Sequence, residues 1–547
     1  MEKRGQDIQS HPSSLIPHPS VSVARSARTV SIAVFGSRIL GLVREQVFAS
    51  LFGASREFDA FVTAFRIPNL LRDLFAEGAL SAAFVTTFTQ KLANEGEKSA
   101  WRLANIVLNA LIIVLGVISV LGIFVAPWLV DAIAPGFRDI AGKTDLTILL
   151  TRIMFPFLLL VAVAALAMGM LNSRHRFGVP ASASMMFNVG SILGGVGFAF
   201  ALGPGFLHDA SQLPRAMVGM SIGTLIGGAS QWLIQIPSLR SVGYHYQPAF
   251  DWHDPGFRQV LHLLGPSVVG TAAVQMNIFV DQWFASYFGN GAVTWLNCAF
   301  RLMQFPIGLF GVAIGVATLP SVSAHAARGD MVEFRKTLGR SIRLAFFLCI
   351  PAACGLSVLA LPIISTIYQH GKFNAFSTEQ TVACVRAFSV GLVAYAAIKI
   401  IAPTFYALGD SRTPMYVAIG AIVVNAGMDY LFAIVCGMKT AGLALSTSTV
   451  ALVNFFLLLG LMRRKIGRVE ATALLRSFLK VALASVLMSA AAYVTHRFCE
   501  FNRYVDVLLS MIVAVIIFGA ACQALGVEEL AELLALLKFG SRAEPPA

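Results

Sequence analysis

Long apolar runs, each about 20 residues in length and separated by short polar segments, recur along the chain from about residue 30 onward. A helix needs about 20 mostly apolar residues to cross the hydrocarbon core of a bilayer. Fourteen runs meet this requirement, centred near residues 40, 74, 117, 160, 190, 225, 275, 308, 353, 394, 424, 452, 484 and 513. The pattern predicts an all-α polytopic membrane protein with about 14 transmembrane helices.

The second and eighth runs are the least apolar of the fourteen, and each contains a proline. Proline removes a backbone donor and clashes with the preceding turn, so it bends or breaks a helix. We therefore expect a bend or a break at Pro68 in the second run and at Pro306 in the eighth.

Three short motifs recur at nearly the same spacing, namely 236, 235 and 238 residues. The pairs are FASLFG with FASYFG (48–53 and 284–289), AFR with AFR (64–66 and 299–301), and LNSRHRFGVP with LGDSRTP (171–180 and 408–414). One such match could arise by chance, but three at nearly one spacing indicate a duplicated half.

Six runs fit in each half, and an even number of spans gives both halves the same orientation in the membrane. The repeat therefore predicts two six-helix lobes related by a pseudo-two-fold axis along the membrane normal, with a substrate path between them. The last two runs fall outside the repeat. The expected organisation is a disordered cytoplasmic tail (1–28), an N-lobe (29–240), a C-lobe (241–466), two extra helices (467–526) and a cytoplasmic C-terminal tail (527–547).

The composition excludes soluble enzyme folds, because 57% of the 547 residues are hydrophobic and only 13% are charged. A soluble domain is usually about a quarter charged. The chain has no Walker A motif, and its seven cysteines form no CxxC pair. We therefore expect a protein that is not an enzyme and that requires no cofactor.

The net charge of +13 would suggest a nucleic-acid partner in a soluble protein. In a membrane protein, basic residues instead collect in cytoplasmic loops. The loops after the eighth and twelfth runs are rich in Lys and Arg, at residues 328–343 and 463–468. This predicts that both termini lie in the cytoplasm and that the chain binds no nucleic acid.

Four arginines lie inside apolar runs, where a charge is costly unless it faces protein or water. They are Arg38, Arg44, Arg72 and Arg301. Arginine suits bidentate binding of phosphate, so their convergence on a central cavity suggests an anionic substrate such as a pyrophosphate. Alternatively, these arginines pair with acidic residues and hold the helices together.

Charged residues also form a stripe along the second run. Asp59, Arg66, Asp73 and Glu77 are spaced by seven, seven and four residues, which places them on one helix face. We expect this face to meet protein or water rather than lipid.

A second polar group lies in the other half of the chain. Asn425 and Asp429 are four residues apart on one run, Asp281 is the one charged residue of the seventh run, and Ser446 and Thr447 lie in the twelfth. Carboxylate, amide and hydroxyl oxygens suit a hard cation such as sodium, and a carboxylate can also carry a proton. The alternative is hydrogen bonding that holds neighbouring helices together.

Several segments resemble the MurJ/MviN family of bacterial lipid II flippases, within the multidrug/oligosaccharidyl-lipid/polysaccharide exporter superfamily. They are SRILGLVRE, DAFVTAFRIPNLLRDLFAEGALSAAFV, APGF and RLMQFPIGLFGVAIGVATLPSVS. The resemblance covers about residues 29–525. It implies a bacterial inner-membrane protein that transports lipid II, with two lobes around a cavity and two extra helices that form a groove for the lipid tail.

The resemblance also implies roles for individual residues. Arg38, Arg44, Arg72 and Arg301 match the essential cavity arginines of the family, and Asp59 and Glu77 match positions that matter for substrate. The group of Asp281, Asn425, Asp429 and Thr447 resembles a sodium site of the family, so sodium or proton coupling is expected. Phe300 and Asp73 depart from some relatives, which have Asp and a basic residue there.

Three other functions remain open from the sequence. The chain could be a flippase for another lipid-linked glycan, a cation-coupled multidrug antiporter, or a membrane scaffold without transport activity. An antiporter for cationic drugs is disfavoured because four arginines would repel its substrates. A self-contained cavity favours a monomer.

Overall fold

All regular structure in the described part of the chain is helical. The computed structural model describes residues 19–73, 79–467, 471–499 and 502–532. The helices of the first half are α1 (Pro19–Phe52), α2 (Arg56–Arg72), α3 (Ala79–Glu95), α4 (Glu97–Ile133), η2 (Pro135–Asp139), α5 (Lys143–Met154), α6 (Phe157–Ser173), α7 (Gly178–Leu202), η3 (Ala210–Gln212), α8 (Leu213–Leu233) and α9 (Ile236–Ser241).

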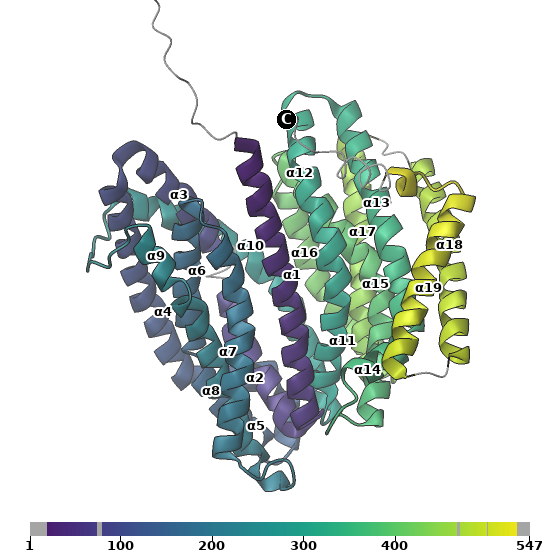
Figure 1. The fold of residues 1–547 in the computed structure, drawn as a ribbon, viewed down its shortest axis with the longest axis horizontal. Coiled ribbons are helices and arrows are strands. Elements are labelled where there is room, and N and C mark those ends of the chain that lie inside the picture. The colour runs from purple at the N-terminus through teal and green to yellow at the C-terminus, as the bar shows by residue number, and fades with distance from the viewer. Residues whose placement is uncertain (1–18, 74–78, 468–470, 500–501, 533–547) are drawn as a thin grey trace, which may run out of the picture.

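The second half has the same kind of architecture and ends with two additional helices. Its elements are α10 (Pro255–Ala285), η4 (Ser286–Phe288), α11 (Ala292–Pro306), η5 (Ile307–Gly311), α12 (Val312–Ala327), α13 (Met331–Val358), α14 (Ala360–Ile367), α15 (Ala375–Ala407), α16 (Arg412–Asp429), η6 (Tyr430–Val435), α17 (Lys439–Ile466), α18 (Ala471–Phe498) and α19 (Arg503–Ala524). Figure 1 shows two lobes that meet at the end where α1 finishes and separate towards the end where it begins.

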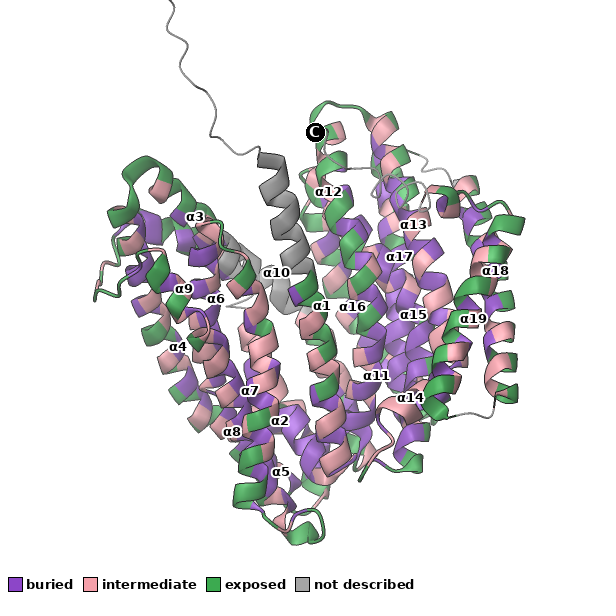
Figure 2. Ribbon diagram, in the orientation of Figure 1, coloured by how far each residue is buried: buried purple, intermediate pink, exposed green. Residues whose placement is uncertain are grey.

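The predicted multi-span membrane architecture is confirmed. Within the described residues, eleven helices are long and apolar enough to cross a membrane. The other three predicted runs, near residues 40, 74 and 275, correspond to α1, to the region of α2 and α3, and to α10. Large apolar side chains such as Phe124, Trp128 and Leu193 are exposed, which suits contact with lipid, and exposed residues occur along the helices of both lobes (Figure 2).

The two prolines affect their helices differently. At Pro306 the α-helical pattern of α11 gives way to the π-helical turn η5 before α12 continues the same path. This is the expected interruption, and π-helical turns inside α-helices are frequent at functional sites. In contrast, α2 continues past Pro68 to Arg72.

The repeated motifs occupy matching places in the two halves. FASLFG ends α1 and FASYFG ends α10 and η4, and the last residue of each, Gly53 and Gly289, has a positive φ of 64° and 85°. Only glycine adopts this conformation without strain. Arg66 and Arg301 lie in the next helices, α2 and α11. The duplicated sequence therefore folds into duplicated elements.

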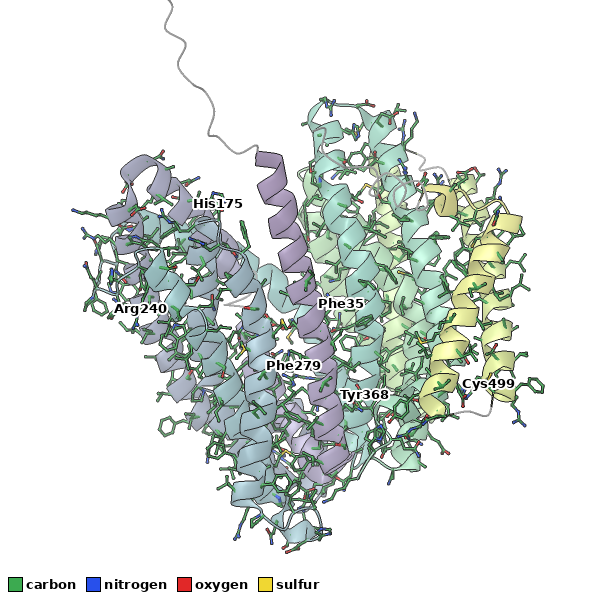
Figure 3. All side chains as sticks on the ribbon, in the orientation of Figure 1. Phe35, His175, Arg240, Phe279, Tyr368 and Cys499 are labelled. Carbon is green, nitrogen blue, oxygen red and sulfur yellow. The ribbon has the colours of Figure 1, made fainter. Side chains whose placement is uncertain are left out.

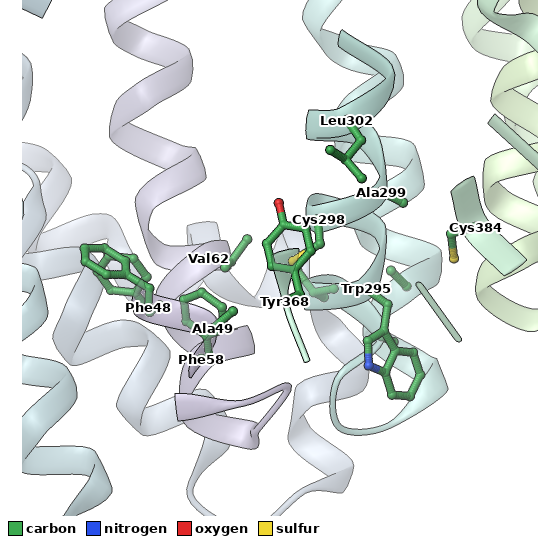
Figure 4. Close-up of a cluster of buried hydrophobic side chains, with 14 of the residues drawn as sticks. Phe48, Ala49, Phe58, Val62, Trp295, Cys298, Ala299, Leu302, Tyr368 and Cys384 are labelled. Atoms are coloured by element: carbon green, nitrogen blue, oxygen red, sulfur yellow. The ribbon is translucent and has the colours of Figure 1, made fainter. Parts of the chain in front are cut away.

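The lobes share a core at the end where they meet. Figure 4 shows apolar side chains of α1 and α2, such as Phe48 and Phe58, near Trp295, Cys298 and Tyr368 of the other half, and all five belong to one buried cluster. Burial of side chains from both lobes closes this end of the molecule.

Two reciprocal contacts reinforce this closed end. The backbone N–H of Gly136 donates to Ser286 Oγ at 3.1 Å, and the backbone N–H of Lys372 donates to the carbonyl of Ser50 at 2.9 Å. Ser50 and Ser286 are the equivalent serines of the two FAS motifs. Each half therefore contributes one loop that binds the same serine of the other half.

The segment that follows α9 packs on the N-lobe, although a boundary at residue 241 would assign it to the C-lobe. Tyr244 Oη donates to Asn105 Oδ1 at 2.8 Å, and Lys91 Nζ lies 3.0 Å from Asp254 Oδ2 at the start of α10. Further along, α10 contacts α16 and α17. The transition between lobes therefore falls within α10.

The two tails are only partly described. Residues 1–18 and 533–547 lie outside the described residues, but α1 already begins at Pro19, within the segment expected to be a tail. At the other end, Glu529 is buried, with its Oε1 3.2 Å from Arg343 Nε, and Glu532 pairs with Arg340 at 2.9 Å. The start of the C-terminal tail is thus docked on the C-lobe.

Candidate substrate cavity and cation site

A cavity of about 2480 Å³ lies between the two lobes. Its volume exceeds the range of about 300–1,000 Å³ that is usual for small-ligand pockets, so it can admit a large head group. Phe279, which lines it, lies between the lobes in Figure 3. The charged lining residues are Arg38, Arg44, Glu45, Arg66, Arg72, Asp73, Asp281, Arg301 and Lys399. Six are basic and three acidic, so the described lining favours an anion.

Two of the predicted arginines share one buried carboxylate. Arg301 Nη2 lies 2.7 Å from Glu45 Oε1, and Arg44 Nη2 lies 3.4 Å from the same oxygen. Asn297 Nδ2 donates to the other oxygen of Glu45 at 3.2 Å. Arg44 is only 7% exposed, and its Nε has no hydrogen-bond partner among the described residues. The guanidinium also lies over the rings of Phe48 and Phe187, at 6.0 and 5.1 Å from their centroids, so aromatic side chains cover part of this buried charge.

Arg38 crosses from α1 to the opposite lobe. A Cβ built on Gly308 would lie 2.1 Å from a guanidinium nitrogen of Arg38, so the arginine lies against the backbone of the π-helical turn η5. No hydrogen bond or ion pair of Arg38 is recorded in the described structure. The glycine therefore makes room for a charged group that faces the cavity.

The predicted stripe on α2 faces the other lobe. Arg66 Nη1 donates to Gln282 Oε1 at 2.8 Å, and Asp73 Oδ2 accepts from Gln275 Nε2 at 2.9 Å. Both glutamines lie on α10. Arg72 pairs with its neighbour Asp73 at 2.7 Å. The stripe thus meets protein and the cavity, as expected.

Asp59 does not line the cavity, although the sequence placed it with the substrate-binding residues. It is fully buried at the closed end, where its Oδ2 lies 2.9 Å from Lys143 Nζ. Its carboxylate also accepts from the backbone N–H of Gly291 at 2.7 Å and from Thr294 Oγ1 at 2.7 Å. Asp59 therefore joins the lobes in this state, and Glu77 lies outside the described residues.

The structure brings the four predicted cation ligands together. Asn425 Nδ2 donates to Asp281 Oδ1 at 2.7 Å and to Asp429 Oδ2 at 3.1 Å, and Thr447 Oγ1 donates to Asp281 Oδ2 at 3.1 Å. Asp429 is fully buried, and its Oδ1 has no partner in the described structure. A buried carboxylate oxygen without a donor is costly. The two carboxylates and the Thr447 hydroxyl are oxygen groups of the kind that hard cations prefer, whereas Asn425 presents its amide nitrogen to both carboxylates. No group of three or more His, Cys, Asp or Glu residues that could hold a metal ion occurs in the described part of the chain.

The sequence interpretation missed several polar residues of the site. Lys399 stands alone in the apolar run AYAAIKIIAPTF, and the rule that identified the other buried charges would have selected it. Gln275, Gln282 and Asn297 carry no charge, so a search for buried charges does not select them. Their role follows from the three-dimensional contacts across the lobe boundary.

An apolar extension continues the cavity towards the two extra helices. It is lined by residues of α13, α14, α18 and α19, namely Phe347, Leu348, Leu356, Ile363, Met488, Val507, Met511, Val515 and Phe518. The cavity therefore combines a charged region between the lobes with an apolar region beside α19.

A membrane-embedded two-lobe fold with a charged central cavity defines the class of multi-span transporters. A family model described as "Lipid II flippase MurJ" matches residues 48–515. The chain is 35% identical to the lipid II flippase MurJ of Burkholderia cenocepacia over 86% of this chain and 89% of that protein. It is 36% identical to a probable lipid II flippase MurJ of Vibrio cholerae over 80% and 82%. The chain belongs to the lipid II flippase MurJ family, which is a family of transporters rather than enzymes.

Solved structures agree with this assignment. One described as "Lipid II flippase MurJ, inward closed conformation" matches with a TM-score of 0.73 and 25% identity, covering 91% of this chain and 99% of that one. An inward-facing multidrug-resistance MATE transporter of the MOP superfamily matches with a TM-score of 0.63 and 16% identity, covering 80% and 95%. The second similarity shows a shared fold alone.

Proposed function

We propose that this chain moves lipid II from the cytoplasmic to the periplasmic leaflet of the bacterial inner membrane by alternating access. The observation that carries the proposal is the cavity in which two arginines share one carboxylate and the buried Arg44 Nε has no partner. The pyrophosphate of lipid II supplies the oxygens that these donors lack.

The head group and the tail of lipid II bind in different parts of the cavity. Arg38, Arg44, Arg72 and Arg301 hold the pyrophosphate, and the remaining volume between the lobes accepts the sugars and peptide. The undecaprenyl tail lies in the apolar region beside α19, where Met511 and Val515 face the same cavity. The polar head can then cross while the tail stays in contact with apolar surface.

The cavity opens towards the cytoplasm in this state. The lobes separate at the end where α1 begins (Figure 1). Most of the basic residues expected in loops lie at helix ends: Arg335, Lys336, Arg340 and Arg343 in the first half of α13, and Arg463, Arg464 and Lys465 in the last turn of α17. Short loops rich in Lys and Arg face the cytoplasm in membrane proteins. Opening to the periplasm then requires the Asp59 contacts at the closed end to break.

Cation binding in the C-lobe supplies a driving force for the cycle. The site formed by Asp281, Asn425, Asp429 and Thr447 takes sodium or a proton, and one charge moved across 100 mV contributes about 2.3 kcal/mol. One chain encloses the whole cavity, so the functional unit is a monomer.

Complementation of cells depleted of their own lipid II flippase tests this function. Wild type should restore growth, whereas Arg38→Ala, Arg44→Ala, Arg72→Ala and Arg301→Ala should fail at equal membrane levels. Arg386→Ala is the matched control, because Arg386 is exposed on α15 and does not line the cavity. Failure of wild type at normal expression would instead favour another lipid-linked glycan, and growth of all four variants would favour a structural role for the arginines.

A further inference from the structure

The two halves place equivalent residues in different chemical situations. Aligning the FAS motifs pairs EQ at residues 45–46 with DQ at 281–282, and aligning the AFR motifs pairs Arg66 with Arg301. Each arginine reaches across to the opposite lobe. Arg301 reaches Glu45 of α1, whereas Arg66 reaches Gln282 of α10, the residue next to Asp281.

Gln282 holds Arg66 in this position through two bonds to α2. Its amide oxygen accepts from Arg66 at 2.8 Å, and its amide nitrogen donates to Thr63 Oγ1 at 2.9 Å. Arg66 and Asp281 line the same cavity, and the glutamine that binds Arg66 is the residue next to Asp281. Asp281 itself bonds to Asn425 and Thr447 of the C-lobe. A fixed positive charge from the N-lobe therefore stands beside the cation site of the C-lobe.

We infer that Arg66 sets the cation affinity of the C-lobe according to the position of the lobes. With the lobes closed at this end, the guanidinium repels a cation at Asp281 and promotes its release. When the lobes separate at this end, the bond from Arg66 to Gln282 breaks and the charge moves away, so the affinity rises. This role of Arg66 rests on the proposed cation site. It predicts that the cation binds from the periplasm and is released to the cytoplasm.

This arrangement explains why the cation site lies in one lobe only. In the N-lobe the equivalent carboxylate, Glu45, already binds the guanidinium of Arg301 at 2.7 Å. The equivalent of Arg301 is Arg66, which binds the amide of Gln282 rather than the carboxylate of Asp281. Asp281 therefore remains available to Asn425, to Thr447 and to a cation.

Sodium-dependent thermal unfolding of the purified full-length protein tests the inference. Sodium chloride is titrated against choline chloride at constant ionic strength, and the concentration giving half of the stabilisation is compared between variants. Arg66→Gln should lower this concentration at least about tenfold, which is the effect of removing a unit charge about 12 Å from the cation at an effective dielectric constant of about 20 and becomes larger at shorter distances. Arg66→Lys keeps the charge and should resemble wild type, as should the exposed-site control Arg386→Gln.

Different results would contradict the role of Arg66, the cation site and lipid II transport. An unchanged half-saturation in Arg66→Gln, or an equal shift in Arg66→Lys, would overturn the role of the charge. If sodium stabilises wild type no more than choline does, and wild type and Asp281→Asn respond alike, the cation site itself would be overturned. Neither result alters the lipid II complementation described above.

Discussion

The helix pairs α1–α2 and α10–α11 come from equivalent stretches of a duplicated sequence, but their cavity chemistry differs. In the first pair, Arg38, Arg44, Arg66 and Arg72 face the cavity. In the second, Arg301 is the one arginine lining the described cavity, and Asp281 joins an uncharged amide and hydroxyl. The duplicated stretches therefore form the same helices but carry different charged residues, with four arginines lining the cavity from the first pair and one arginine and one aspartate from the second.

Polar residues of each helix pair find their hydrogen-bond partners in the other pair. Glu45 of α1 is satisfied by Arg301 of α11, and Arg66 of α2 is satisfied by Gln282 of α10. Asp59 of α2 binds Thr294 of α11, which is its own equivalent at a spacing of 235 residues. These three contacts therefore join the two lobes, and they must break when the lobes separate at this end.

Removing the closed-end carboxylate should have the largest effect on stability. Asp59→Ala leaves Lys143 buried without its carboxylate, and breaking a buried ion pair in this way typically costs about 3–5 kcal/mol. We expect a lower membrane level and a lower thermal midpoint. The double variant Asp59→Ala with Lys143→Met should recover part of the loss, and free-energy changes that simply add from Asp59→Ala and Lys143→Met would contradict the pairing.

Breaking the pair that joins α1 to α11 should affect transport more than stability. Arg301→Ala removes from the cavity a guanidinium available to the pyrophosphate, and losing a hydrogen bond to a charged group costs about 1.5–3 kcal/mol, or about a 10- to 100-fold decrease in lipid II affinity. Glu45→Gln in the same chain should restore the protein level but not lipid II transport. Recovery of transport in that double variant would mean that Arg301 serves only to neutralise Glu45.

A methyl group at the π-helical turn should have an intermediate effect. Gly308→Ala collides with the guanidinium of Arg38 and forces it to move, at a cost of about 1–3 kcal/mol typical of overpacking. We expect about a tenfold decrease in lipid II transport in proteoliposomes. The change should have no further effect in an Arg38→Ala background, and Gly420→Ala, which has open space around it, should be neutral.

The smallest effect concerns the loops that carry the third repeated motif. In the C-lobe, Lys465 and Thr413 bind Asp410 and hold the pKa of that carboxyl well below its usual range. A lowered folded-state pKa stabilises the protein above the unfolded pKa, near 4, and this stabilisation is lost as the pH falls. Because the pair is near the surface, the loss should be at most about 1 kcal/mol.

Thermal midpoints between pH 5 and pH 3 measure this effect. Asp410→Asn should remove the part of the pH dependence that belongs to this loop. The N-lobe has Asn172 at the equivalent position, so Asn172→Asp is the informative companion variant. An unchanged pH profile in Asp410→Asn would contradict the assignment.

The sequence predicted much of this architecture because membrane insertion imposes a strong pattern. Thirteen of the fourteen expected span centres lie in described helices, and the fourteenth, near residue 74, falls at residues 74–78, outside them. The four cavity arginines, Asp281 and Asp429 could be predicted because a buried charge in an apolar run needs a reason to be there.

The remaining features depend on tertiary contacts that hydropathy does not report. The sequence predicts Asp59 to be a substrate-binding residue. In the structure its carboxylate is instead buried against Lys143 and the backbone N–H of Gly291. The transition between lobes within α10 follows from Lys91 and Asp254, two charges that are far apart in the sequence. Gln282 has no distinctive signal until its place beside Arg66 is known.

Direct binding of lipid II to the purified protein is the most decisive test of the central claim, that cavity arginines recognise the pyrophosphate. Native mass spectrometry can compare wild type with Arg44→Ala, Arg301→Ala and the control Arg386→Ala. Arg44→Ala and Arg301→Ala should each bind lipid II at least about tenfold more weakly than wild type, and Arg386→Ala should bind like wild type. Unchanged binding in well-folded Arg44→Ala and Arg301→Ala would contradict the account and leave these arginines with a purely structural role.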